Sequence, residues 1–201
     1  MKKILFAALP IAAAAIMAVI PASDPLPLGS PIPKPEHKMK DVSGKTVSLK
    51  DAQNKNGLLV MFSCNTCPYV IKSQSRAYEV LKYAQGNDIG IAVLNPNEAQ
   101  RDGDDSYDAM KEYATGQGYN WAYLVDENSV LADAFGANRT PECFLFNKEG
   151  ILVYHGAIDD NPGNAAAVSR KHLMMAIDEM KTGKEITVKQ SKSVGCTIKR
   201  L

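Results

Sequence analysis

Two cysteines separated by two residues, Cys64 and Cys67, follow directly after an apolar run at residues 58–62. Such a run is long enough for a buried strand. The segment after the cysteines, residues 68–86, is long enough for a helix that ends at Gly86. Pro68 suits the first helical turn, where its missing N–H leaves nothing unsatisfied. This stretch therefore predicts a strand-to-helix junction that carries a dithiol.

The predicted junction suggests a separate role for each of the two sulfurs. A cysteine at or near a helix N-terminus meets unpaired N–H groups and a dipole that favour the thiolate, which would make Cys64 the attacking nucleophile. Cys67, one turn further on, could then attack a mixed disulfide on Cys64 and release the substrate. The spacing predicts two-electron thiol–disulfide exchange.

Other uses of a Cys-x-x-Cys pair stay open at this point. Half a zinc site would need further ligands, but Cys143 and Cys196 stand alone and the sequence has no His-x-x-x-His pair. A purely structural disulfide would close a short loop, which restrains little of the unfolded chain. Redox chemistry is the preferred interpretation.

The N-terminus has the pattern of an export signal. Lys2 and Lys3 precede an apolar, alanine-rich run at residues 4–20, and small residues follow it. Residues 1–22 are therefore predicted to be a signal peptide, with an uncleaved membrane anchor as the alternative. We expect a periplasmic or secreted protein, working where disulfides persist.

The remaining sequence predicts one domain behind a linker. Five prolines within residues 24–36 predict an extended lead-in at residues 23–38, and residues 39–201 are long enough for one core. The net charge of +1, without charged blocks, gives no electrostatic case for nucleic acid. Membrane contact is expected only if the signal segment stays attached.

Apolar periodicity and turn residues predict the elements of this domain. The acidic residues 102–105 lack the glutamate that a calcium loop needs at its twelfth position, so we interpret them as a solvated helix start. The expected elements are a hairpin at 41–49, strands at 58–62, 89–94, 121–125, 143–146 and 151–158, and helices at 68–86, 107–116, 129–135 (capped by Asn128 or Ser129) and 169–181.

Four stretches of the sequence resemble the thioredoxin fold and, more closely, the thioredoxin-like redoxins grouped with the AhpC/TSA family. The resemblance implies an α/β protein with a central mixed sheet flanked by helices and an N-terminal β-hairpin. The matching stretches are residues 64–70 around the dithiol, 140–146 beginning Thr-Pro-Glu-Cys, 156–161, and the tail 193–199.

The resemblance also implies the parts of a site. Cys64 would attack, Cys67 would resolve, and Pro141 would be a cis-proline facing the dithiol, with Thr140 beside it to pair with an incoming peptide. Glu142 is a candidate proton acceptor or substrate contact, because the aspartate that thioredoxins bury before the first cysteine is Leu58 here. No bound cofactor or metal is needed.

The two remaining cysteines, Cys143 and Cys196, are possible secondary thiols. We expect a buried free thiol and a tail thiol, with a bond between them or exchange with the dithiol left open. The expected partners are a disulfide- or dithiol-bearing protein or peptide and an unidentified redox partner.

Three other functions stay open. A peroxiredoxin carries a Thr or Ser three residues before its reactive cysteine, but Met61 and Cys64 hold the corresponding positions, so a peroxidase is disfavoured. Copper delivery could use the dithiol with His155 or His37, although copper carriers of this fold space their cysteines by three residues. A binding module without catalysis would not need Cys64.

Overall fold

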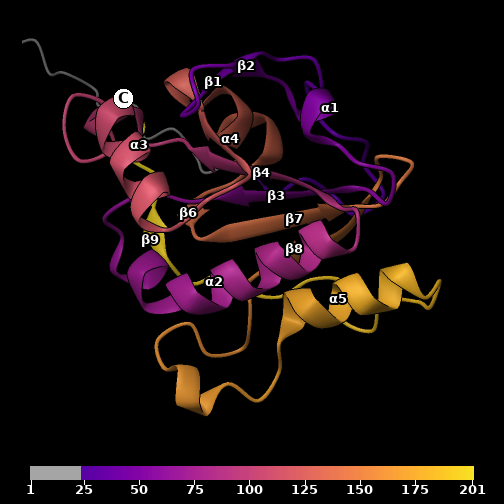
Figure 1. The fold of residues 1–201 in the computed structure, drawn as a ribbon. Coiled ribbons are helices and arrows are strands. Elements are labelled where there is room, and N and C mark those ends of the chain that lie inside the picture. Colours follow the sequence, from indigo (N-terminus) through magenta and orange to yellow (C-terminus); the bar gives the residue numbers. More distant parts are fainter. Residues whose placement is uncertain (1–23) are drawn as a thin grey trace, which may run out of the picture.

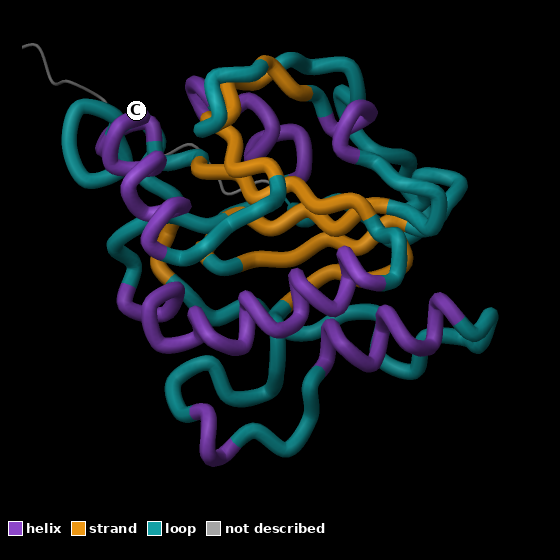
Figure 2. Tube along the Cα trace, in the orientation of Figure 1, coloured by secondary structure: helices purple, strands orange, loops and turns teal. Residues whose placement is uncertain are grey.

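The computed structural model describes residues 24–201 (Figure 1), so the predicted signal peptide at residues 1–22 lies outside the described residues. Within residues 24–201, seven strands form one mixed sheet. Figure 2 shows them as a central layer between helices. In sheet order the strands are β2 (Thr46–Val47), β1 (Met39–Asp41), β5 (Ala122–Val125), β4 (Gly90–Asn95), β3 (Leu58–Phe62), β7 (Glu142–Phe146) and β8 (Leu152–Gly156).

The centre of the sheet is β3, which pairs in parallel with β4 and antiparallel with β7. All residues of β3 and β4 are buried, as expected for apolar runs with both faces covered. The predicted strand–helix–strand unit around the dithiol is therefore confirmed.

Alternating residues of β3 point to opposite layers. Leu59 and Met61 pack in the core under α2, α3 and α5. Leu58, Val60 and Phe62 pack in the core on the side of α1 and α4. The helices are α1 (Leu49–Ala52), α2 (Pro68–Gly86), α3 (Tyr107–Gly116), α4 (Val130–Phe135) and α5 (His172–Lys181), with short 3₁₀ turns η1 (Glu98–Gln100), η2 (Glu127–Ser129) and η3 (Ala165–Ala167).

Apart from shifts of one or two residues at strand and helix ends, two predicted boundaries and one predicted cap differ from the structure. The hairpin ends at β2, because the Ser48 hydroxyl accepts the Asp51 amide in a capping box that starts α1. Helix α5 begins at His172, three residues later than predicted. Neither Asn128 nor Ser129 caps α4 through its side chain.

The cap of α4 comes from further back in the sequence. Both oxygens of the buried Asp126 carboxylate accept amide hydrogens, from Leu131 at 2.8 Å and from Ala132 at 2.8 Å. The Ser129 hydroxyl instead donates to the Pro96 carbonyl oxygen at 2.7 Å. A negative charge at a helix N-terminus is favourable, so Asp126 supplies the cap predicted for Ser129.

A second, two-stranded sheet joins the tail to the domain. Strand β6 (Arg139–Thr140) pairs antiparallel with β9 (Cys196–Thr197). Figure 1 shows β9, in yellow, beside β6 near the beginning of α2. No strand is predicted in the tail, so β9 is an addition to the predicted elements.

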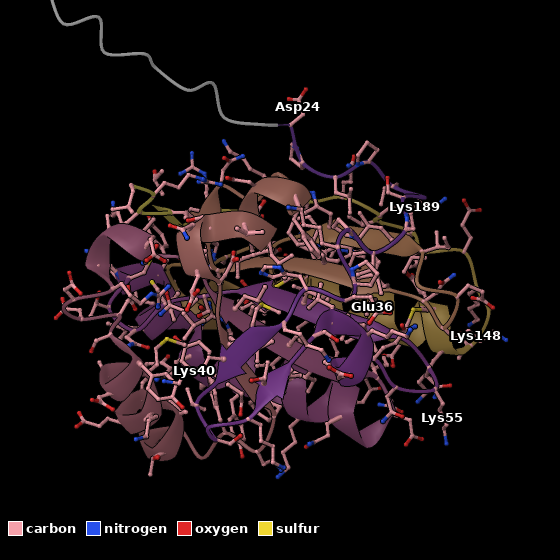
Figure 3. All side chains as sticks on the ribbon, turned by 90° about the horizontal axis from the view of Figure 1, so that it is seen from above. Asp24, Glu36, Lys40, Lys55, Lys148 and Lys189 are labelled. Atoms are coloured by element: carbon pink, nitrogen blue, oxygen red, sulfur yellow. The ribbon has the colours of Figure 1, made fainter. Side chains whose placement is uncertain are left out.

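The proline-rich lead-in lies along the domain. The Leu26 amide donates to the Phe135 carbonyl oxygen at 2.9 Å, and the Ile32 amide donates to the Gly150 carbonyl oxygen at 3.0 Å. Figure 3 shows charged side chains of both signs around the rim of the molecule, including Asp24, Lys55 and Lys148. Between residues 24 and 201, no helix is both long and apolar enough to span a membrane.

Candidate active site

The dithiol lies where β3 ends and α2 begins. After Phe62 the Ser63 amide still donates to the Leu94 carbonyl oxygen at 2.8 Å, and the chain then turns. Cys67 is the N-cap of α2 and Pro68 occupies its first turn. Cys64 precedes the cap by three residues, so Cys67 lies closer to the helix N-terminus than Cys64 does.

The turn between the cysteines is held by a buried polar network. The Asn65 amide donates to Asp105 Oδ1 at 2.9 Å, and the Tyr123 hydroxyl donates to Asn65 Oδ1 at 2.8 Å. Asn95 and Asn97 donate their side-chain amides to the two Asp105 oxygens at 2.7 and 2.8 Å. Asp105 is fully buried, so the interpretation of residues 102–105 as a solvated helix start is wrong for Asp105.

Thr140, which is predicted to pair with an incoming peptide, contacts both sulfurs. The Thr140–Pro141 peptide bond is cis, as predicted. Thr140 Oγ1 lies 3.3 Å from Cys64 Sγ, and Cys67 Sγ lies 3.2 Å from the Thr140 carbonyl oxygen. The structure therefore brings Cys64, Cys67, Thr140 and Pro141 into one site.

The two sulfurs have opposite pKa shifts. The interaction with the neighbouring Cys64 thiol is the main cause that lowers the pKa of the Cys67 thiol, against burial, and the nearby Cys196 thiol adds to the fall. The hydrogen bond with Cys67 and burial raise the pKa of the Cys64 thiol, and the charge of Asp105 adds to this rise. The first thiolate thus forms on Cys67, whereas the sequence predicts it on Cys64.

The protonation state of Cys67 also decides whether it can hydrogen-bond to Thr140. The Thr140 carbonyl oxygen accepts a hydrogen bond from Cys67 only while that sulfur is a thiol. Ionisation of Cys67 therefore removes this hydrogen bond. Because the two sulfurs interact directly, they titrate as one pair.

Glu142 holds the segment at residues 138–140 in place through hydrogen bonds. Its Oε2 accepts the Asn138 and Arg139 amides at 2.9 and 3.1 Å, and its Oε1 lies 2.8 Å from His155 Nε2. Burial would raise the pKa of the Glu142 carboxyl, but the hydrogen bonds from His155 and the two amides lower it below its usual value. These contacts place Glu142 as a positioning residue for the segment that ends at Thr140.

The two secondary thiols occupy different places. Cys143 is fully buried in the core under α2 and α5, and burial raises its pKa. Cys196 lies in the small cluster formed by Cys64, Cys67 and Val70. The structure thus brings Cys196, and not Cys143, to the dithiol.

The histidine suggested for copper has other partners. His155 hydrogen-bonds to Glu142, and its ring stacks on Phe144 with the ring centroids 4.4 Å apart. Across residues 24–201, no group of three His, Cys, Asp or Glu side chains is arranged to hold a metal ion.

Sequence reasoning missed Asn65, Asp105, Tyr123 and the contact of the tail with the site. For the tail, a signal was present: Val194, Cys196 and Ile198 alternate with polar or small residues, as in a short strand. For Asp105 there was none, because the two exposed aspartates beside it, Asp102 and Asp104, look the same in the sequence as this buried one.

The comparison with protein families is decisive at this point. The model of the AhpC/TSA family matches residues 29–155, which include the dithiol and the cis-proline segment. The chain belongs to the AhpC/TSA family. The match stops before β9, so the tail that contacts the site lies outside it.

Among individual proteins, this AhpC/TSA chain is similar to thiol-disulfide oxidoreductase ResA of Bacillus subtilis (strain 168), with 25% identity over 121 residues. That match covers 59% of this chain and 62% of ResA, less than two thirds of its length. The similarity therefore covers only part of each protein.

Solved structures extend the likeness over more of the chain. A hypothetical protein from Sinorhizobium meliloti 1021 superimposes with a TM-score of 0.80 at 30% identity, covering 89% of this chain and 97% of that one. An uncharacterized conserved protein from Geobacillus kaustophilus gives a TM-score of 0.80 at 31% identity, covering 87% and 93%.

The thioredoxin-like fold is likewise confirmed. The thioredoxin domain of a thiol-disulfide oxidoreductase from Bacteroides vulgatus superimposes with a TM-score of 0.56 at 19% identity, covering 70% of this AhpC/TSA chain and 96% of that domain. At this identity the comparison concerns the fold alone, namely a central mixed sheet flanked by helices.

Proposed function

We propose that this chain is a thiol–disulfide oxidoreductase whose Cys64–Cys67 pair exchanges two electrons with disulfide- or dithiol-bearing proteins or peptides. One observation carries the proposal: the two reduced sulfurs lie in one buried cluster, and both contact Thr140. The name of the relative ResA supports the same reaction class. The chemistry resides in the sulfurs and needs no bound cofactor.

Exchange at this pair needs one sulfur to attack and the other to resolve. Oxidation of the dithiol forms the Cys64–Cys67 bond and passes two electrons to the substrate disulfide, which leaves as two thiols. The sequence predicts attack by Cys64. The pKa of Cys67, lowered chiefly by its interaction with Cys64, instead favours the thiolate on Cys67 at neutral pH.

The first test is the equilibrium reduction potential of the pair in a protein with Cys143→Ser and Cys196→Ser. Redox buffers of glutathione or dithiothreitol should give a value between about −270 and −120 mV, the range of working redox proteins of this fold. A value far below about −300 mV would indicate a structural disulfide and end the proposal.

Single-cysteine variants in the same background assign the roles. Cys64→Ser and Cys67→Ser should each lose catalytic reduction of insulin disulfides, because neither can close the intramolecular bond. The variant that keeps the attacking cysteine should still form a mixed disulfide with the substrate. Undiminished turnover of Cys64→Ser would contradict exchange through the Cys64–Cys67 pair. A binding module without catalysis predicts instead that Cys64→Ser leaves the biological activity of the protein intact.

Peroxide reduction is a second candidate because of one contact. Thr140 Oγ1, 3.3 Å from Cys64 Sγ, could donate to a bound peroxide as well as to the sulfur. Against it, Cys64 is 2% exposed and its pKa is raised. We expect hydrogen peroxide to oxidise the reduced protein no faster than it oxidises glutathione, whereas a rate a thousandfold higher would favour the peroxidase.

The proposed location rests on the N-terminal sequence. We propose that residues 1–22 direct export and are removed, and that residues 23–38 and 39–201 form the lead-in and the redoxin domain. Mass spectrometry of the protein purified from the cell envelope or medium would give the processed N-terminus. A cytoplasmic protein that retains Met1 would contradict this proposal.

A further inference from the structure

The sulfurs of the proposed reaction differ in how far solvent reaches them. Cys64 is 2% exposed and Cys67 is 4% exposed, whereas Cys196 is half-buried. A disulfide of an outside protein needs direct access to the sulfur that attacks it. With the tail seated, Cys196 is the accessible thiol of the three.

The tail, residues 193–199, is fixed to strand β6 by regular backbone pairing. Thr140 lies opposite Cys196 in the β6–β9 register, and Arg139 lies opposite Thr197. The Ile198 amide then donates to the Asn138 carbonyl oxygen at 3.1 Å, and the Ile198 side chain is 4% exposed. The edge of Thr140, where an incoming peptide was predicted to pair, is therefore already occupied by Cys196.

Gly195 shows how closely the tail approaches. A Cβ atom placed on Gly195 would lie 2.2 Å from the Thr140 carbonyl oxygen and 3.2 Å from the Pro141 nitrogen. These are backbone atoms, which cannot swing aside as a flexible side chain would. Glycine is thus required here by contact with the cis-proline segment.

This approach brings Cys196 directly to Cys67. Cys196 packs in the same cluster as Cys64 and Cys67. Cys67 Sγ lies 3.2 Å from the carbonyl oxygen of Thr140, the residue that pairs with Cys196. Burial, and then the neighbouring Cys67 sulfur, raise the pKa of Cys196.

We propose that Cys196 is a third redox thiol, which takes over the disulfide from the buried pair and exchanges it with thiols and disulfides outside. The proposal rests on the function proposed above. Starting from the Cys64–Cys67 disulfide, Cys196 loses its proton and attacks Cys67 Sγ. The Cys64–Cys67 bond breaks, the Cys67–Cys196 bond forms, and Cys64 leaves as a thiolate that takes up a proton.

No electrons are gained or lost in that internal step. An external thiol then attacks Cys196 and releases Cys67, and a second external thiol resolves the mixed disulfide. The net result is a reduced protein and one external disulfide, formed from the two external thiols. Run in reverse, the same sequence reduces an external disulfide through Cys196.

The first test traps the proposed bond. A protein with Cys64→Ser and Cys143→Ser retains only Cys67 and Cys196. Oxidation in a glutathione redox buffer, followed by proteolysis and mass spectrometry, should show a Cys67–Cys196 disulfide. The matched protein with Cys67→Ser and Cys143→Ser should give at least tenfold less of a Cys64–Cys196 bond. Absence of the Cys67–Cys196 bond would overturn the proposal.

Two glycine variants test whether seating of the tail is what brings the sulfurs together. In the Cys64→Ser, Cys143→Ser protein, Gly195→Ala should lower the yield of the Cys67–Cys196 bond several-fold. Gly163→Ala, which has no neighbouring atom within 4 Å of the added carbon, should leave the yield unchanged. Equal yields in both variants would contradict the role assigned to the Gly195 contact.

The last test asks whether exchange passes through Cys196. In a Cys143→Ser background, Cys196→Ser should slow the oxidation of the reduced protein by oxidised glutathione at least tenfold. An unchanged or faster rate would mean that the tail only covers the site. If the Cys64–Cys67 bond also fails to form at equilibrium without Cys196, the function proposed above fails as well, so the two failures are distinguishable.

Discussion

The backbone amide of Asn65 lies 2.9 Å from the buried carboxylate of Asp105. This contact joins the turn between the two cysteines to the segment before α3, forty residues away in sequence. Asp105 also accepts hydrogen bonds from Asn95 and Asn97 at the end of β4. One side chain therefore orients three segments around the dithiol and adds negative charge beside Cys64.

Asp105→Asn should show both effects. The amide can replace only part of the acceptor capacity, so we expect a loss of about 1–3 kcal/mol in the free energy of unfolding, measured in urea. Removal of the charge should lower the pKa of Cys64, measured by the ultraviolet absorbance of its thiolate. The control is Asp104→Asn, which makes the same charge change at an exposed residue whose backbone oxygen alone contacts Asn65.

Thr140→Val should weaken the reactivity of Cys64 because it removes the hydroxyl 3.3 Å from Cys64 Sγ while keeping the shape of the side chain. Loss of a hydrogen bond worth about 1 kcal/mol should raise the pKa of Cys64 and slow its alkylation by iodoacetamide severalfold. Thr140→Ser keeps the hydroxyl and should behave like the unchanged protein. Equal slowing in both variants would point to packing instead.

Arg76→Met should destabilise the protein strongly. Arg76 Nε lies 2.6 Å from Asp159 Oδ2, and the two side chains are 11% and 3% exposed. The variant leaves a buried carboxylate without its partner, which costs about 3–5 kcal/mol. Lys55→Met breaks an exposed pair with Asp88 and should cost at most about 1 kcal/mol. Similar losses of unfolding free energy in the two variants would contradict the conclusion that the buried Arg76–Asp159 pair matters more to stability than the exposed Lys55–Asp88 pair.

Asp126 should give the stability a distinct pH dependence. Burial raises its pKa from 3.8 to about 6, against the hydrogen bonds from the Leu131 and Ala132 amides. Between those pH values the folded protein holds a proton that the unfolded chain has lost, so stability falls as pH rises through this window and levels off above it. The full effect is roughly 3 kcal/mol.

Asp126→Asn should remove this fall. Unfolding free energies of both proteins are measured in urea from pH 4 to pH 7, and their difference cancels the groups that they share. We expect the difference to change by up to about 3 kcal/mol across the window in favour of the variant at high pH. A difference independent of pH would show that Asp126 stays ionised in the folded protein.

Local chemistry explains why most of the fold could be predicted. The apolar runs of β3 and β4, the proline at the start of α2 and the turn between β7 and β8 each favour one conformation by themselves. Cys64, Cys67 and the cis-proline segment followed from the same local patterns together with the family resemblance. These predictions did not depend on residues far away in the chain.

The features that were missed depend on distant partners. Ser48 ends the hairpin because Asp51 completes a capping box, and Asp126 rather than Ser129 caps α4 because its carboxylate faces two free amides. Asp105 can be buried because Asn65, Asn95 and Asn97 donate hydrogen bonds to its carboxylate. The hydrophobic periodicity of the sequence does not reveal these partners. The lowered pKa of Cys67 arises first from its interaction with Cys64 and also from Cys196, which lies more than a hundred residues later in the sequence.

The pairing of β6 with β9 also sets an order in time. Cys67 is made 129 residues before Cys196 (196 minus 67), which at about 5–20 residues per second corresponds to roughly ten seconds of synthesis. The dithiol and the cis-proline segment are therefore synthesised before the strand that pairs with Thr140. Until β9 is in place, the backbone edge of Thr140 beside Cys67 stays open.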